Sequence, residues 1–273
     1  MVHRATGGVS GFFGAPGGCG ARRVRVIAVI RSSVAWAWAA LSLPALTLVS
    51  LLGLPFVGQR GHDWASTFWM RSVLWLTGLR VRVTGTEHVR RDDRYVVACN
   101  HQSLIDILAV VSVLQPLTPV RFMAKRSLFF VPVLGFAMWA FGHVPVDRAR
   151  GRGIVGKIRR AEKAAAAASF VFFPEGTRSL DGAMRPFKRG AFWLAARTNV
   201  PVLPITITGA LEAFPKGQCC VYGNPEVQLA IHAPIPVKGP RDSAHTVEEL
   251  ETRTWHAIAE GLPAELRTRS HAA

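Results

Sequence analysis

A histidine and an aspartate stand five residues apart in the segment NHQSLIDILAV, residues 100–110. A carboxylate set among apolar residues costs stability unless it has a partner. On one regular helix of 3.6 residues per turn, side chains five positions apart point about 140° away from each other. His101 and Asp106 can therefore meet only if His101 lies in the loop before the helix and folds back over its first turn.

Such a pair could supply a general base. Asp106 would accept a hydrogen bond from one ring nitrogen of His101, and the other ring nitrogen would face a crevice. The preceding residues are typical of a strand, and Ser103 is a good N-cap for the helix that follows. Taken alone, the segment fits a capping histidine and a surface aspartate better than a catalytic pair, so other residues have to decide.

A second motif, FVFFPEGTRS, covers residues 170–179. Its hydrophobic strand ends at Phe173, and a turn made by Pro174 and Gly176 then presents polar side chains, namely Glu175, Thr177 and Arg178. The planar fork of an arginine matches a phosphate group, and the turn could also offer backbone N–H groups to an anion. Glu175 would either hold a substrate hydroxyl or fix Arg178 by an ion pair. A tight turn with a solvated charge pair fits the motif equally well.

Three further cations follow or adjoin strand-like runs. Arg148 lies in GHVPVDRARG, Lys125 follows VRFMA, and Lys188 lies in PFKRGAF. One general base, several cations and no cluster of metal-ligating residues describe transfer to a hydroxyl of a phosphorylated molecule, with neither a metal nor another cofactor.

The elements that must position these residues form an alternating pattern from Arg80 onward. Strands are predicted at 81–84, 95–99, 120–124, 143–146, 169–173, 202–208, 220–222 and 227–232, and helices at 103–114, 133–140, 154–168, 189–197 and 246–260. The alternation predicts an α/β fold with a mostly parallel β-sheet flanked by helices. In such sheets the chemistry lies in loops at the carboxyl ends of the strands, where the motifs above are found.

The part of the chain before the sheet is apolar. Residues 32–59 carry no charge, and about 20 residues suffice to cross a bilayer as a helix. Pro44 and Pro55 are expected to break this run into shorter pieces, and a second apolar stretch follows at 65–79. We therefore expect a membrane-associated helical hairpin over 22–79 that enters one leaflet or spans the bilayer. A cleavable signal peptide is disfavoured, because the apolar run far exceeds an h-region.

The composition and the net charge of the chain indicate how it is divided into domains and what it can bind. Residues 1–21 are expected to be disordered or to precede the true start, 80–262 to form the α/β domain, and 263–273 to form a basic tail. The 33 Lys and Arg against 17 Asp and Glu give a formal charge of +16, which favours a nucleic acid, an anionic lipid surface or an acidic substrate as partner. The four cysteines lack CxxC spacing, so we expect reduced thiols in a protein that faces the cytosol.

Four ordered blocks resemble those of the glycerolipid acyltransferases, the 1-acylglycerol-3-phosphate acyltransferase family. NHQSLID is similar to the NHxxxxD block, GHVPVDR to the IDR-type block, FPEGTRS to the block of that sequence, and VPVLPIT to the fourth, proline-containing block. The resemblance covers roughly residues 80–240. It departs from the family pattern at Pro145, where a bulky apolar residue is usual, and at Ser127, where an acidic residue often stands.

The resemblance implies roles for the individual residues. His101 would take the proton from a glycerol hydroxyl as this attacks an acyl thioester, with Asp106 orienting the ring and no acyl-enzyme. The phosphate-binding residues would be Arg148, Glu175, Gly176 and Arg178, with Thr177 in the same turn and Lys125 and Lys188 as lesser candidates. Oxyanion donors are not assigned.

The resemblance also implies the substrates and the location. The acceptor would be lysophosphatidate, and the donor acyl-CoA or an acidic acyl-carrier protein. The enzyme would sit at the cell membrane among lipids, its catalytic domain on the cytoplasmic face, with no nucleic acid as partner. Alternatives are another lyso-lipid or glycerol 3-phosphate as acceptor, a metal-dependent membrane hydrolase using His101, Asp106 and Glu175, and a non-catalytic binder of anionic lipid or nucleic acid.

Overall fold

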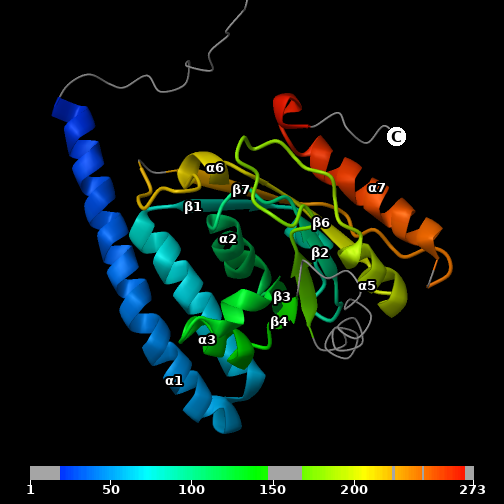
Figure 1. Ribbon diagram of the computed structural model, residues 1–273, viewed down its shortest axis with the longest axis horizontal. Coiled ribbons are helices and arrows are strands. Elements are labelled where there is room, and N and C mark those ends of the chain that lie inside the picture. Colours follow the sequence, from blue (N-terminus) through cyan, green and yellow to red (C-terminus); the bar gives the residue numbers. More distant parts are fainter. Residues whose placement is uncertain (1–18, 147–167, 223–224, 242, 268–273) are drawn as a thin grey trace, which may run out of the picture.

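A seven-stranded sheet forms the centre of the protein (Figure 1). The computed structural model describes residues 19–146, 168–222, 225–241 and 243–267. In space the strands follow the order β1-β7-β6-β2-β5-β3-β4. Their bounds are Arg80–Thr84 (β1), Val96–Cys99 (β2), Val120–Lys125 (β3), Val144–Val146 (β4), Ser169–Phe172 (β5), Val202–Thr208 (β6) and Glu226–Ile231 (β7). All neighbours pair in parallel except β6 and β7, so the predicted mostly parallel α/β sheet is confirmed.

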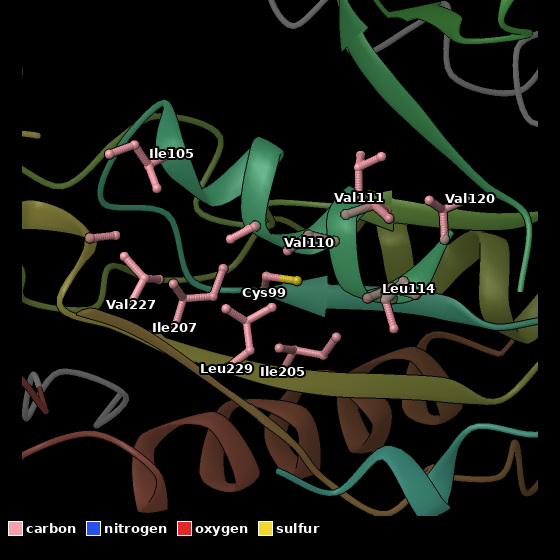
Figure 2. Close-up of a cluster of buried hydrophobic side chains, with 14 of the residues drawn as sticks. Cys99, Ile105, Val110, Val111, Leu114, Val120, Ile205, Ile207, Val227 and Leu229 are labelled. Carbon is pink, nitrogen blue, oxygen red and sulfur yellow. The ribbon is translucent and has the colours of Figure 1, made fainter. Parts of the chain in front are cut away.

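Helices cover both faces of the sheet. Strand β2 shows why, because all four of its residues are buried: Val97 and Cys99 belong to one core cluster, and Val96 and Ala98 to another. Successive side chains on a strand point to opposite faces, so a strand that is apolar throughout needs cover on both. The helices that supply it are α2 (Ile105–Leu114) on one face, and α5 (Gly190–Thr198) and α7 (Ala244–Glu260) on the other. Figure 2 shows α2 side chains packed against β2, β6 and β7 in the first cluster.

One predicted strand is absent from the structure, and one short helix was not predicted. Cys220–Tyr222 is not a strand, and the backbone N–H of Val221 instead donates to the Ser32 hydroxyl, 2.9 Å away in the N-terminal helix. The short helix α6 (Ala210–Ala213) was not predicted, because four residues are too few to show a helical period. The remaining helix α3 covers Leu134–Ala140 as expected, whereas the helix predicted at 154–168 falls almost wholly outside the described residues.

The N-terminal helical segment α1 (Cys19–Thr77) folds back on itself as a hairpin beside α2 and α3 (Figure 1). The chain reverses at Gly58, whose φ of 59° suits glycine, whereas the backbone stays helical at Pro44 and Pro55. The expectation that the prolines break the run is therefore wrong, since a proline removes only one helical hydrogen bond while a reversal needs a permissive backbone. Among the described residues, Val26–Val49 is the one segment long and apolar enough to cross a membrane, and most of it is exposed.

The hairpin is fastened to the α/β domain at both of its ends. Near its tip, Asp63 forms an ion pair of 2.8 Å with Arg121 of β3, and both side chains are largely buried. At the other end, the indole N–H of Trp36 donates to the carbonyl of Cys219. Between them, the guanidinium of Arg71 donates to a carbonyl of α2. The hairpin therefore lies along the domain rather than projecting away from it.

Candidate functional site

His101 and Asp106 meet in the loop between β2 and α2. The ring Nδ1 of His101 lies 2.8 Å from Oδ2 of Asp106. His101 precedes the helix, which begins at Ile105, so its side chain reaches back over the first turn as the helical spacing required. The Asp106 side chain is fully buried, while 12% of the His101 side chain is exposed. The histidine thus forms the accessible end of the pair.

The Asp106 carboxylate organises the whole loop. Its Oδ2 also accepts the backbone N–H groups of Gln102 and Ser103, at 2.7 and 2.8 Å. An ionised carboxylate only accepts hydrogen bonds, so the proton of the His101 ring lies on Nδ1 and Nε2 keeps its lone pair. The pair can therefore act as a base through Nε2.

Ser103 contacts the start of the helix as a capping serine does, although the helix begins at Ile105 and the residue at the N-cap position is Leu104. The Ser103 hydroxyl oxygen accepts the N–H of Ile105 at 3.4 Å. The same hydroxyl donates to the carbonyl of Phe214 at 2.7 Å, which ties the loop to the segment after β6.

An aromatic ring holds the histidine from its other side. Phe173, which follows β5, stacks on the His101 ring with 4.0 Å between centroids and 19° between planes. The sequence interpretation treated Phe173 only as the end of a strand. Phe173 directly precedes the turn formed by residues 174–178 (PEGTR), at the edge of the sheet where the motifs lie. This position in the sequence could have identified it.

Glu175 is buried and binds backbone rather than side chains. Its Oε1 accepts the N–H of His101 at 2.9 Å, and its Oε2 accepts the N–H of Arg185 at 3.2 Å. Both carboxylate oxygens thus have backbone donors, a role that differs from the two considered for this residue. Burial raises the pKa of Glu175 to about 7, against the opposing effect of these two hydrogen bonds.

Two further connections fix the histidine loop to its neighbours. The N–H of Ser179 donates to the carbonyl of His101 at 2.8 Å, so Glu175 and Ser179 bind the backbone N–H and the backbone carbonyl of the histidine. On the opposite flank, the Asn100 side chain exchanges two hydrogen bonds with the backbone of Ile207 in β6, at 2.8 and 2.7 Å. Sequence reasoning missed Asn100, although an asparagine amide is the side chain that can both donate to and accept from a backbone.

The predicted phosphate-binding residues that the structure describes lie around the same edge of the sheet. Gly176 has a φ of +77°, and a Cβ added there would lie 2.8 Å from Nζ of Lys188, so the lysine lies directly against this glycine. Arg178 is half-buried and Thr177 is exposed. Lys125 is exposed at the carboxyl end of β3, and Arg148 lies outside the described residues. The structure thus joins Glu175 to His101 and Lys188 to Gly176.

An apolar cavity of about 280 Å³ adjoins this site. It lies between the two arms of the hairpin and the start of α2, with Leu104 and Ile105 in its wall. Trp36, Trp69 and Leu74 line it from the hairpin side. Because Ile105 directly precedes Asp106, the cavity lies behind the first turn that carries the carboxylate.

Replacing Glu175 with glutamine is expected to flatten part of the pH dependence of folding stability. The pKa of Glu175 is about 7 in the folded protein against an ordinary value of 4.5. Between these two pH values, Glu175 keeps its proton in the folded protein and releases it in the unfolded chain. This contribution to stability is fully present below the ordinary pKa and is lost as the pH rises through the folded-state pKa. Urea midpoints of both proteins, measured from about pH 5 to 8, should diverge over this window. Parallel curves would contradict the prediction.

Comparisons with known proteins agree on one family. Residues 80–208 match the family model described as Acyltransferase. A chloroplastic 1-acyl-sn-glycerol-3-phosphate acyltransferase of Brassica napus is 36% identical over 205 residues, which cover 72% of this chain and 58% of that protein. One from Chlamydomonas reinhardtii is 32% identical, covering 88% and 72%, and the human alpha form is 31% identical, covering 78% and 76%.

A solved structure is similar over almost its whole length. The crystal structure of the 1-acyl-sn-glycerophosphate acyltransferase from Thermotoga maritima superposes with a TM-score of 0.71 at 26% identity, covering 87% of this chain and 95% of that one. By contrast, the chain spans little more than half of the Brassica napus protein and of a similar one from Arabidopsis thaliana, at 58% and 56%.

Proposed function

Because this chain belongs to the 1-acyl-sn-glycerol-3-phosphate acyltransferase family, we propose that it moves a fatty acyl group from an acyl thioester to the 2-hydroxyl of 1-acylglycerol 3-phosphate. The product would be phosphatidate. The observation that carries the proposal is the 2.8 Å contact between His101 and Asp106, which leaves Nε2 of a partly exposed ring as a base.

The reaction would proceed by direct transfer. Nε2 of His101 accepts the proton of the 2-hydroxyl while the hydroxyl oxygen attacks the thioester carbonyl. The tetrahedral intermediate then collapses, the carbon–sulfur bond breaks, and the thiolate leaves and takes up the proton. Asp106 stabilises the imidazolium that forms in between. A positioned base of this kind contributes typically about 10²–10⁴-fold to the rate.

The phosphate of the acceptor would bind beside the histidine. Lys188 lies against Gly176, and Arg178 lies in the same turn, which is itself joined to the His101 backbone through Glu175. A guanidinium can bind two phosphate oxygens at once, and a lysine adds a point charge. We assign Arg178 the larger role, with Thr177, Lys188, Lys125 and Arg148 as further phosphate-binding residues.

The apolar cavity and the hairpin fit a lipid substrate. The cavity of about 280 Å³ behind the first turn of α2 is lined almost entirely by apolar atoms and would receive part of an acyl chain. The hairpin exposes large apolar side chains, such as Phe56 and Trp75 at 88% and 79% exposure. We propose that this surface lies in the cell membrane with the catalytic domain on the cytoplasmic face. The positive surface would then attract acyl-CoA or an acidic acyl-carrier protein.

An acceptor panel tests the proposed function. With an acyl thioester as donor, the purified enzyme should acylate lysophosphatidate faster than glycerol 3-phosphate or a lyso-ornithine lipid. Arg178→Ala should raise the KM for lysophosphatidate more than the KM for the donor, because it removes a contact to the acceptor phosphate alone. Arg241→Ala, at an exposed position outside the motifs, is the control. A preference for another acceptor would overturn the choice of substrate, and equal shifts of both KM values would overturn the role of Arg178.

The same contacts weigh against a metal-dependent hydrolase. Its ligands would be His101, Asp106 and Glu175, yet both Glu175 oxygens and Oδ2 of Asp106 accept N–H groups. Among the residues that the structure describes, these three side chains do not form a group that could hold a metal ion. Acyl transfer through His101, by contrast, requires no change in the hydrogen bonds that Asp106 and Glu175 make.

A further inference from the structure

A second polar crevice lies at the opposite edge of the sheet from His101. Its volume is about 990 Å³, and it is bounded by the hairpin tip, the loop before β2 and the segment between α2 and β3. Arg94 lines it and precedes β2, whereas His101 follows β2. At roughly 3.3 Å per residue along a strand, about 20 Å separates the two positions. The crevice is thus separate from the catalytic loop.

The charges around this crevice are mostly positive. Two aspartates line it, and one of them, Asp63, is already paired with Arg121. Five arginines line it as well, namely Arg60, Arg71, Arg91, Arg94 and Arg121. Such a surplus of guanidinium groups attracts an anion.

Two buried hydrogen-bond donors in the crevice lack an acceptor within the described part of the chain. Gln115 is only 8% exposed; its Oε1 accepts the N–H of Val120, while its Nε2 has no partner among the described residues. The Nε of Arg94 is likewise buried, and no described residue accepts from it. Native proteins leave few buried polar groups unsatisfied. Since both groups are donors, they favour a ligand that offers acceptor oxygens.

The rim of the crevice is aromatic and belongs to the hairpin. Trp64 and Phe68 stack with 5.7 Å between their centroids, and both are more than half exposed. Exposed aromatic side chains are enriched where proteins meet a membrane–water interface. Both residues belong to the hairpin, which exposes other large apolar side chains as well, so an occupant of the crevice would have an anionic group inside it and an apolar part along the rim.

We infer that this crevice binds the phosphate headgroup of an anionic phospholipid, at a site distinct from the catalytic one. The headgroup oxygens accept from Gln115 and Arg94, the arginines neutralise its charge, and the acyl chains lie along Trp64 and Phe68. A bound lipid joins the hairpin tip to the amino-terminal edge of the sheet and thereby fixes the orientation of the enzyme on the membrane. This inference goes beyond the acyl transfer reaction and does not depend on it.

Binding of phosphatidylglycerol to the purified enzyme in neutral detergent tests the inference, read by native mass spectrometry and by thermal stabilisation. The variant Arg60→Gln with Arg91→Gln changes two exposed lining residues and should bind at least roughly tenfold more weakly than wild type. The control, Arg197→Gln with Arg253→Gln on α5 and α7, makes the same change in net charge and should bind like wild type.

A second variant addresses the orphaned donors. Gln115→Glu keeps an oxygen for the N–H of Val120 but replaces the unpartnered NH₂ with a carboxylate oxygen, so it should repel the headgroup. Phosphatidylcholine, which carries no net charge, should bind neither protein specifically. Equal binding of phosphatidylglycerol by the double variant and its control would overturn the site. Complete displacement of the lipid by millimolar inorganic phosphate would overturn the choice of a phospholipid.

Discussion

His101→Ala is expected to lower kcat for acylation of lysophosphatidate by about 10²–10⁴-fold, with little change in either KM. The reason is that no other described side chain near the motif loop can replace Nε2: Asp106 is fully buried, and both oxygens of Glu175 accept backbone N–H groups. Steady-state rates with saturating acyl donor and acceptor measure the effect.

The control for this variant is a histidine outside the site. His256 is exposed on α7, so His256→Ala should keep the wild-type rate. His101→Ala should melt below wild type but remain folded, since the ring contacts with Asp106 and Phe173 are lost while the backbone contacts to Glu175 and Ser179 remain. Full activity of a folded His101→Ala protein would eliminate the proposed mechanism.

Asp106→Asn is expected to lower kcat by roughly 10²-fold or more while leaving the loop folded. An asparagine oxygen can still accept the N–H groups of Gln102 and Ser103 and the Nδ1–H of His101, which all converge on the single atom Oδ2. The negative charge that stabilises the imidazolium is lost, so the base is oriented but weak. Rates and a thermal melt separate this outcome from simple unfolding.

The double variant sharpens the test of Asp106. If the aspartate acts through the histidine, His101→Ala with Asp106→Asn should be no slower than His101→Ala alone, because residues of one catalytic unit give non-additive effects. Additive losses in the double variant would show that Asp106 works independently of the ring, for example by holding substrate.

The sequence predicted the parts of the fold that depend on local pattern. Strand β2 and helix α2 appear in the sequence as apolar runs, and helical spacing alone required His101 to lie outside the helix if it is to meet Asp106. The resemblance to known motifs then turned an ambiguous pair into a candidate site.

The contacts that hold His101 and Asp106 in place could not be predicted from neighbouring residues in the sequence. Glu175 binds the backbone of a residue 74 positions earlier, and Asn100 binds one 107 positions later. A local pattern carries no information on which backbone groups such side chains meet. Likewise, the β-rich run ending at Tyr222 looks like a strand, but it lies beside the hairpin, where Val221 finds a side-chain acceptor instead of a neighbouring strand.

The spatial order of the strands has a consequence for how the protein folds. Strand β2 lies between β6 and β5, so the loop bearing His101 is clamped by segments that are synthesised long after it. Pairings of such large sequence separation form slowly, because a long loop must close before they are made. During synthesis, the histidine reaches its final position only after Ile207 has emerged and β6 has paired, so the proposed base is positioned late, once most of the sheet exists.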